Sequence, residues 1–303
     1  MPLPEGYTVR RADAGDAAEV AAVMTAADDV AEDVRAPDVE REWRSLDLEH
    51  DVWVVESPVG RVAAYLESLQ RGEDRLAAEG YVHPEHTGRG LGGHLLELSE
   101  ARGKELLDGS GRVTNAIIDS NRAATELFES RGYRSTRHFF RMAIDLEEEP
   151  PPAHWPEGLE PRPFDRAHAE AFHAANEDAF AEEFGHVPET FEEWRDRRLD
   201  APRVDTSQWL GVWDADELAA TLICDAKRFE MGWVGSVGVR TPWRRRGLGL
   251  ALLNHAFGEF WQRGERRIGL GVDAENPTGA ARLYERAGMR ALFDAVLYEK
   301  ELA

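Results

Sequence analysis

The sequence predicts a mixed α/β fold, with helices on a mixed sheet of the α/β or α+β class, that occurs twice along the chain. Strand-like and helix-like apolar patterns alternate through both halves. Four pairs of landmarks recur in the same order, at offsets of 152, 157, 155 and 156 residues. These pairs are Gly6 and Gly158, Gly90 and Gly247, Asn121 and Asn276, and Gly132 and Gly288. A nearly constant offset indicates a duplicated domain.

The boundary between the halves is a charged and proline-rich stretch from Leu146 to Pro152. Consecutive prolines continue neither a helix nor a ladder, and they favour an extended spacer. We therefore predict a first domain at residues 1–146, a linker at 147–157 and a second domain at 158–303.

The elements of the first half follow from apolar period, caps and turn residues. In chain order they are a strand at Tyr7–Arg11, a helix at Asp13–Ala27, strands at Val52–Glu56, Arg61–Leu69 and Leu76–His83, a helix at Leu91–Leu107, a strand at Val113–Ile118, a helix at Asn121–Ser130 and a strand-like end at Tyr133–Ile144.

The second half repeats this order. Its predicted helices are Asp165–Ala181, Phe191–Arg198, Leu248–Trp261 and Asn276–Ala287, and its predicted strands are Gln208–Trp213, Glu217–Asp225, Trp233–Val239, Ile268–Val272 and Ala291–Glu299.

Composition limits the functions that the chain can have. Its 303 residues carry a net charge of −22, so we expect no nucleic-acid partner, because phosphate backbones need a basic face. The acidic excess suits an amine-bearing substrate, although a solvated acidic surface that aids solubility is the more common cause. The single cysteine, Cys224, follows an apolar run and is expected to be a buried structural thiol.

No stretch has the length and apolarity of a membrane span, and the first ten residues lack a signal-peptide core. We therefore expect a cytoplasmic protein with no membrane partner, and we also expect no metal.

Two copies of one glycine-rich turn are the most informative motif. The chain reads Val-His-Pro-Glu-His-Thr-Gly-Arg-Gly-Leu-Gly from Val82 and Val-Arg-Thr-Pro-Trp-Arg-Arg-Arg-Gly-Leu-Gly from Val239. Each copy is a short strand, a basic turn and a helix that begins among the glycines. Free N–H groups and the helix dipole then converge on an anion, so a pyrophosphate ligand is expected twice.

The order of strand, Gly-x-Gly turn, helix, strand, Asn and a helix with Leu-Tyr resembles the GNAT superfamily of acetyl-CoA-dependent N-acetyltransferases, over nearly the whole chain. The phosphate motif of this family is Arg or Gln, two residues, Gly, one residue, then Gly or Ala. The run Arg244–Gly249 matches it fully, whereas the first copy has Thr87 at the leading position. The resemblance implies two tandem GNAT-like domains.

The resemblance also implies which residues bind acetyl-CoA, the expected cosubstrate. In the family, the strand before the turn pairs with pantetheine and polarises the thioester carbonyl. In the second half the implied residues are Val237, Gly238, Val239, Arg244, Arg245, Arg246, Gly247, Leu248, Gly249, Leu250 and Asn276. Their counterparts in the first half are Tyr81, Val82, His83, Gly88, Arg89, Gly90, Leu91 and Gly92.

Catalysis distinguishes the halves. A family tyrosine protonates the departing thiolate, and Leu283-Tyr284 fits that position, whereas the first half has Leu127-Phe128. A core aromatic is the alternative reading of Tyr284, and Asn276 is readable as a helix N-cap that also touches the cofactor. We expect the first half to lack catalysis and either to bind acetyl-CoA or to pack beside the second half and shape the acceptor cleft.

The general base and the acceptor site are less specific. An ammonium must lose a proton before it attacks, and Glu230, Asp225 and Ser236 are the candidates, with Glu230 preferred. Glu182 and Glu183 lie in an acidic segment where family members usually admit the acceptor, although a solvated loop is the default explanation of such a segment.

The sequence thus predicts a direct-attack N-acetyltransferase for a primary amine of a small molecule, working from the second half. A non-catalytic acyl-CoA-binding regulator and a protein or peptide amine acetyltransferase remain as alternatives.

Overall fold

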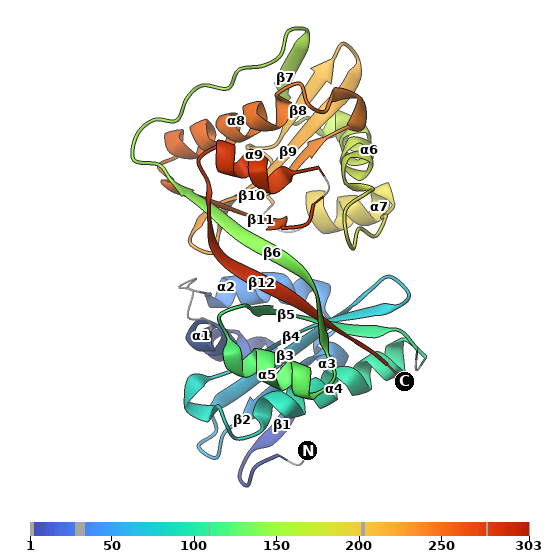
Figure 1. The fold of residues 1–303 in the computed structure, drawn as a ribbon, viewed down its shortest axis with the longest axis vertical. Helices are drawn as coiled ribbons and strands as arrows, with labels where there is room; N and C mark the ends of the chain where they lie inside the picture. The colour runs from blue at the N-terminus through green and yellow to red at the C-terminus, as the bar shows by residue number, and fades with distance from the viewer. Residues whose placement is uncertain (1–2, 28–33, 109, 201–203, 277, 303) are drawn as a thin grey trace. The chain divides into compact units, whose positions relative to one another are not determined.

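The computed structural model describes residues 3–27, 34–108, 110–200, 204–276 and 278–302, and it has the predicted mixed α/β class (Figure 1). The first repeat contains β1 (Thr8–Arg11), α1 (Ala17–Ala27), α2 (Ala36–Glu42), α3 (Leu48–Asp51), β2 (Val52–Glu56), β3 (Val62–Arg71), β4 (Arg75–Val82), α4 (Leu91–Leu106), β5 (Arg112–Ile118), α5 (Arg122–Ser130) and β6 (Arg134–Asp145). The second contains β7 (Leu159–Pro163), α6 (Ala169–Phe180), α7 (Phe191–Trp194), β8 (Leu210–Asp214), β9 (Glu217–Arg228), β10 (Met231–Val239), α8 (Leu248–Gln262), β11 (Arg267–Asp273), α9 (Ala280–Arg286) and β12 (Arg290–Glu301).

Most predicted elements are confirmed to within a few residues, but α2, α3 and β7 lie outside them. The two helices have seven and four residues, too few to display an apolar period. Strand β7 contains Pro161 and Pro163, which normally argue against a strand. They are tolerated because β7 pairs only with β8, at the end of the strand order.

The chain divides into two compact units, Met1–Phe139 with Phe293–Ala303, and Phe140–Leu292. These differ from the predicted domains at 1–146 and 158–303, because β6 and β12, the last strands of the two repeats, each have residues in both units. The predicted linker at 147–157 contains neither helix nor strand. We keep the predicted bounds as the division between sequence repeats.

The last strand of the chain completes the sheet of the first unit. In that unit the strand order is β1-β2-β3-β4-β5-β12, and β12 runs antiparallel to β5 with Ala295 opposite Ile118. The side chains of Val296 and Tyr298 lie in the same apolar cluster as Leu91. The first unit is therefore closed by residues distant in sequence.

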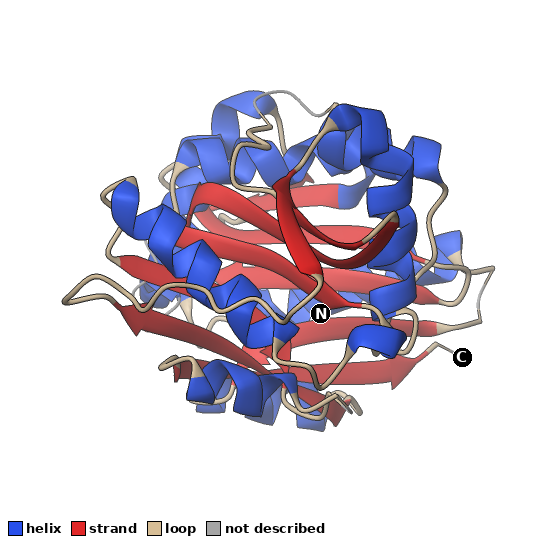
Figure 2. Ribbon diagram, turned by 90° about the horizontal axis from the view of Figure 1, so that it is seen from above, coloured by secondary structure: helices blue, strands red, loops and turns tan. Residues whose placement is uncertain are grey.

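Strand side chains of the first unit alternate between two apolar clusters, as expected for a sheet covered on both faces. Figure 2 shows helices on both sides of strands in the ribbon. Val52 and Val54 of β2 pack with α1, whereas Trp53 and Val55 pack in the cluster that contains α4. Helix α1 therefore covers one face of this sheet and helix α4 the other.

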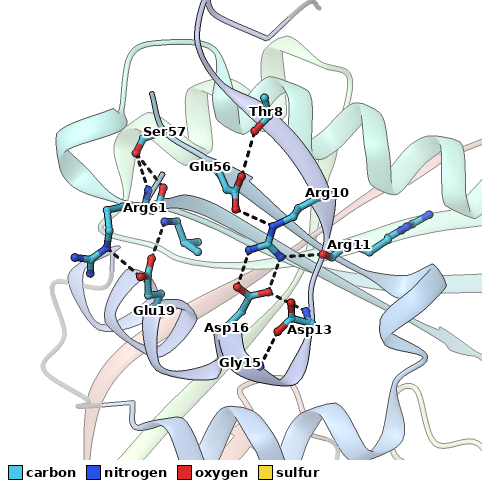
Figure 3. A network of polar contacts seen from close by, with 11 residues as sticks. Thr8, Arg10, Arg11, Asp13, Gly15, Asp16, Glu19, Glu56, Ser57 and Arg61 are labelled. Atoms are coloured by element: carbon cyan, nitrogen blue, oxygen red, sulfur yellow. Dashed lines mark hydrogen bonds and ion pairs between the residues drawn. The ribbon is translucent and has the colours of Figure 1, made fainter. Parts of the chain in front are cut away.

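The partly exposed cation of Arg10 fixes the start of the first unit (Figure 3). The Arg10 guanidinium donates to both oxygens of Asp16 at 2.7 and 2.8 Å and to Glu56 at 2.8 Å, and it holds the pKa of Asp16 below its usual value. The Asp13 carboxylate accepts from the Gly15 N–H at 2.7 Å, which confirms the predicted Asp cap. Strands β1 and β2 are thereby tied to the helical segment.

A second set of hydrogen-bonded polar residues in the first unit lies on the face of the sheet that α1 and α2 cover. Trp43 Nε1 donates to the Tyr65 hydroxyl at 2.7 Å, and that hydroxyl donates to the Glu67 carboxylate. Burial and the neighbouring Glu79 carboxylate raise the pKa of Glu67 to about 8. Glu67 is therefore held largely in its protonated form at neutral pH.

In the second unit the strand order is β6-β11-β10-β9-β8-β7, and β10 is parallel only to β11. Helices α8 and α9 pack in one apolar cluster and α6 and α7 in another. Cys224 is 1% exposed in the first of these, and burial raises the pKa of its thiol, as expected for a structural cysteine. Among the described helices, none has the length and apolarity to cross a membrane.

Candidate active site

The turn between β10 and α8 presents a row of backbone donors. Gly247 caps the helix with φ 90° and ψ −1°, and the buried Leu248 anchors its first turn. Within the described residues, no backbone N–H from Arg245 to Leu250 has a hydrogen-bond acceptor, whereas the flanking Arg244 and Ala251 N–H groups do. Six free donors at the start of a fifteen-residue helix fit an anion such as a pyrophosphate.

Arg245 has a left-handed backbone, with φ +63°. Its counterpart in the first repeat is Gly88, with φ +70°, so both copies of the turn share one conformation. A left-handed arginine costs about 1–2 kcal/mol. Arg245 and Arg246 are exposed and form no ion pair with any described residue, which leaves two cations beside the free donors.

Arg244, predicted to bind the cofactor, has a guanidinium that is engaged inside the protein. It donates to the carbonyl oxygens of Val239 at 3.1 Å and Ala179 at 3.0 Å, and it contacts the Glu182 carboxylate at 3.3 Å. Its side chain therefore joins the turn to the end of α6. Glu182, predicted as a substrate residue, is largely exposed and forms this ion pair.

The strand before the turn has an open edge. β10 pairs with β11 only at Gly232 and Trp233, although it pairs with β9 up to Val239. The segment Val237–Val239 thus has no ladder on its β11 side. A Cβ at Gly238 would lie 2.7 Å from Thr221 Oγ1, so a larger residue there would require the Thr221 side chain to shift.

Helix α9 packs against the first turn of α8 through Leu283. Leu283 packs so closely on Gly249 that a Cβ there would lie 2.7 Å from Leu283 Cδ2. The neighbouring Tyr284 is 9% exposed, and its hydroxyl makes no hydrogen bond to a described residue. Burial, together with the Glu183 carboxylate, raises the pKa of Tyr284, so its phenol keeps its proton.

Glu183 and Asn276 meet although 93 residues separate them. Asn276 Nδ2 donates to Glu183 Oε1 at 3.1 Å. Burial and the Asp273 carboxylate raise the pKa of Glu183, which outweighs the lowering effects of His186 and Asn276. Glu183, Asn276 and Tyr284 were each predicted as site residues. A hydrogen bond joins Glu183 to Asn276, and the Glu183 charge acts on the Tyr284 phenol.

The helix expected from Asn276 begins later, and its N-cap is Gly279. The Asn276 Oδ1 instead accepts the Thr278 N–H at 2.9 Å, in a turn that precedes α9. Asn276 is therefore not the helix cap. Asp273 and His186 were not predicted as part of this group. The sequence signal that could have indicated Asp273 is its position three residues before Asn276.

The structure does not bring Glu230 to this group. Glu230 lies in the turn between β9 and β10, with φ +56° and an ion pair to Lys227 at 3.3 Å. Seven residues of extended strand, about 23 Å, separate it from Val237. The other candidate bases also have contacts elsewhere: Asp225 lies opposite Trp233, and the Ser236 hydroxyl donates to Asn176 at 3.0 Å.

The first repeat has the same turn. Gly90 caps α4 with φ 87° and ψ 2°, and in the described chain no backbone N–H from Gly88 to Gly93 has an acceptor. Its β4 pairs with β5 only from Arg75 to Ala78, so the expected edge at Tyr81, Val82 and His83 is open beyond that pairing. Arg89 is exposed and Leu91 is buried.

The first repeat differs from the second at the positions that correspond to the expected catalytic and coenzyme-binding residues. Phe128 is 6% exposed, and its ring packs edge-on against Tyr133 with the ring centres 5.0 Å apart. Asn121 caps α5 by accepting the Ala124 N–H at 3.0 Å. The Thr87 hydroxyl donates to the Pro84 carbonyl oxygen at 2.8 Å. These residues are satisfied within the first unit and supply no acid.

Known proteins resemble this chain in sequence and in structure. The model of the acetyltransferase (GNAT) family matches residues 20–133 and again 169–289. A mycothiol acetyltransferase from Thermobispora bispora is 31% identical over 249 residues, covering 78% of this chain and 79% of that protein. The enzyme of the same name from Streptomyces scabiei is 32% identical over 235 residues, covering 74% and 71%.

Two solved structures share the tandem fold. The crystal structure of a GCN5-related N-acetyltransferase from Sphaerobacter thermophilus has a TM-score of 0.87 and 37% identity, and the match covers 99% of this chain and 97% of that one. A tandem GNAT protein from the clavulanic acid biosynthesis pathway has a TM-score of 0.72 with 16% identity, covering 97% and 98%, and it supports the fold alone.

Proposed function

We propose, since this chain belongs to the acetyltransferase (GNAT) family and is an acetyl-CoA-dependent N-acetyltransferase, that its second repeat transfers the acetyl group to a primary amine of a small molecule. The proposal rests on the Asn276–Glu183 hydrogen bond, the buried phenol of Tyr284, and the contact of its neighbour Leu283 with Gly249 in the α8 turn. The first repeat has the turn without the tyrosine.

Acetyl-CoA supplies an activated acetyl thioester. The residues present fit it, because the free N–H groups from Arg245 to Leu250 suit its pyrophosphate and the cations of Arg245 and Arg246 suit its negative charge. The open edge at Val237–Val239 would hold the pantetheine arm by backbone hydrogen bonds, as an added strand does.

Tyr284 is the proposed general acid. Its phenol keeps a proton because its pKa is raised, and its hydroxyl makes no hydrogen bond to any described residue that would have to break first. Donation from Tyr284 Oη would neutralise a leaving thiolate. Phe128 has the same ring at the corresponding position and no proton to give.

Glu183 is proposed to bind the acceptor amine, and we propose that it also acts as the general base. A carboxylate that accepts from Asn276 at 3.1 Å has a fixed orientation, and its raised pKa makes it a stronger base than an ordinary glutamate. An incoming ammonium would form an ion pair with Glu183 and then lose its proton to the Glu183 carboxylate. Glu230 lies in the turn before β10, about 23 Å of extended strand from Val237, and is too far away for this role.

A small amine is the proposed acceptor. The relatives in Thermobispora bispora and Streptomyces scabiei are named mycothiol acetyltransferases, so the desacetylated form of mycothiol is the first acceptor to test. Simple primary amines, sugar amines and a lysine peptide complete the panel. Thiol release only with the peptide would overturn the small-molecule proposal.

The assignment to the second repeat has a matched test. Arg246 and Arg89 occupy corresponding places in the two turns, and both are exposed. Arg246→Glu is expected to raise the KM for acetyl-CoA several-fold, because it reverses a charge beside the free donors, whereas Arg89→Glu leaves the KM unchanged. Steady-state thiol release measures both, and the reverse pattern would assign turnover to the first repeat.

A further inference from the structure

Three metal-ligating side chains gather in the turn between β4 and α4 of the first unit. His83, Glu85 and His86 lie within four residues, and their ligand atoms are all within 4.8 Å of one another. The short helical turn Pro84–His86 fixes the backbone that carries them. None of them is needed for acetyl transfer as proposed above.

The chemistry of this set suits a borderline divalent ion. Two imidazoles and one carboxylate are ligands that Zn²⁺ takes at about 2.0–2.2 Å in tetrahedral geometry, which places the ligand atoms about 3.3–3.6 Å apart. The three ligand atoms all lie within 4.8 Å of one another, so binding requires side-chain rotations that move them by about 1 Å or less. Three protein ligands would leave a further position open to water or another small ligand.

His86 already has the outer contact that metal-binding histidines use. The Tyr7 hydroxyl lies 2.8 Å from His86 Nδ1, and Tyr7 is itself 9% exposed in the apolar cluster of the first unit. In the tautomer in which Nδ1–H donates to the Tyr7 hydroxyl, this hydrogen bond fixes the ring orientation and leaves the Nε2 lone pair for a ligand bond. A partner of this kind sets the tautomer and typically raises metal affinity.

The second repeat provides an internal comparison. Its corresponding turn, Thr241–Trp243, has the same short helix, with Arg240, Pro242 and Trp243 at the places of the three ligands. Trp243 anchors that turn by donating to Asp214 at 2.8 Å. The backbone therefore forms without histidine or glutamate, so the turn itself does not require the three ligands.

We propose that His83, Glu85 and His86 bind one divalent transition-metal ion, with zinc the preferred occupant and Tyr7 a positioning residue for His86. The site belongs to the first unit alone. It adds a metal to a chain for which the sequence predicts none.

The proposal is tested by calorimetric titration of the whole chain with zinc chloride alone. The chain used carries no histidine tag. We expect one equivalent to bind, and we expect His86→Ala and Glu85→Gln each to weaken binding at least tenfold. Tyr7→Phe keeps the ring in the core and is expected to weaken binding about tenfold, because only the outer hydrogen bond is lost. His50→Ala removes an exposed histidine elsewhere in the first unit and is the matched control, with unchanged affinity.

Cobalt(II) added to the chain gives a second readout, since visible d–d bands of a four-coordinate ion should appear and should vanish in Glu85→Gln. Circular dichroism checks that each variant folds. If His86→Ala does not fold, the exposed Glu85→Gln carries the test. Absence of saturable binding, or an affinity that Glu85→Gln and His86→Ala leave unchanged, would overturn the proposal.

Discussion

Replacing Tyr284 by phenylalanine removes one hydroxyl and keeps the ring that packs in the core of the second unit. The hydroxyl has no hydrogen-bond partner among the described residues, so its loss leaves no buried donor or acceptor unsatisfied. We therefore expect the free energy of unfolding to change by less than about 0.5 kcal/mol.

The effect on turnover should be far larger than the effect on stability. General acid catalysis contributes about 10²–10⁴-fold, so we expect kcat to fall by about that factor, or about 3–5 kcal/mol of transition-state stabilisation. The affinity for acetyl-CoA should stay nearly constant, because the free donors of the α8 turn are unchanged. Because the pKa of Tyr284 is raised, its loss should lower kcat across the whole neutral range.

Stopped-flow and steady-state detection of free thiol measure kcat, and calorimetry measures coenzyme binding. Phe128→Tyr, which restores the hydroxyl at the corresponding place in the first repeat, is the matched control and should leave kcat unchanged. Turnover of Tyr284→Phe within twofold of the original chain would remove Tyr284 from the acid role. A parallel loss of coenzyme affinity and of stability would make it a structural residue.

Three further variants test the charges described above. Glu183→Gln should lower kcat/KM about 10²-fold and abolish the rise of activity with pH through the raised pKa of Glu183, as a pH-rate profile would reveal; an unchanged profile would exclude it as the base. Arg245→Gly should leave the free energy of unfolding unchanged or raise it by up to about 1 kcal/mol, because the φ of +63° suits glycine, as it does at Gly88. The same variant should weaken coenzyme binding several-fold, and unchanged binding would contradict a role for the Arg245 charge. The free energy of unfolding of Glu67→Gln should rise relative to that of the original chain as the pH rises from about 4.3 to about 8. The reason is that the raised pKa of Glu67 makes the original chain less stable over that pH window. Urea unfolding of both chains measures the difference, and a constant difference across this pH range would refute the prediction.

The turn at Gly247 and its copy at Gly90 could be predicted because the information is local. Glycines at fixed spacing, a strand before them and an apolar run after them specify a left-handed cap and a helix start within a few residues. The same holds for the Asp13 cap. In these places the order of residues alone defines the backbone.

The candidate active site depended on contacts that the sequence does not encode locally. Glu230 seemed suitable because it lies between two predicted strands, yet strand length places it far from Val237. Arg244 looked like a free cation, and the end of α6 engages its guanidinium. The orientation of Asn276 toward Glu183 requires two loops 93 residues apart to meet.

The order of residues alone specifies two copies of one mixed α/β unit with a Gly-x-Gly turn, of which only the second is followed by a Leu-Tyr helix. That β12 completes the sheet of the first unit, and that Asn276 hydrogen-bonds to Glu183, follows only from the folded chain. The two kinds of feature differ in how far apart in the sequence the interacting residues lie. Turns and caps depend on neighbours along the chain, whereas sheet partners and the electrostatic environment of a carboxylate depend on which distant segments pack together.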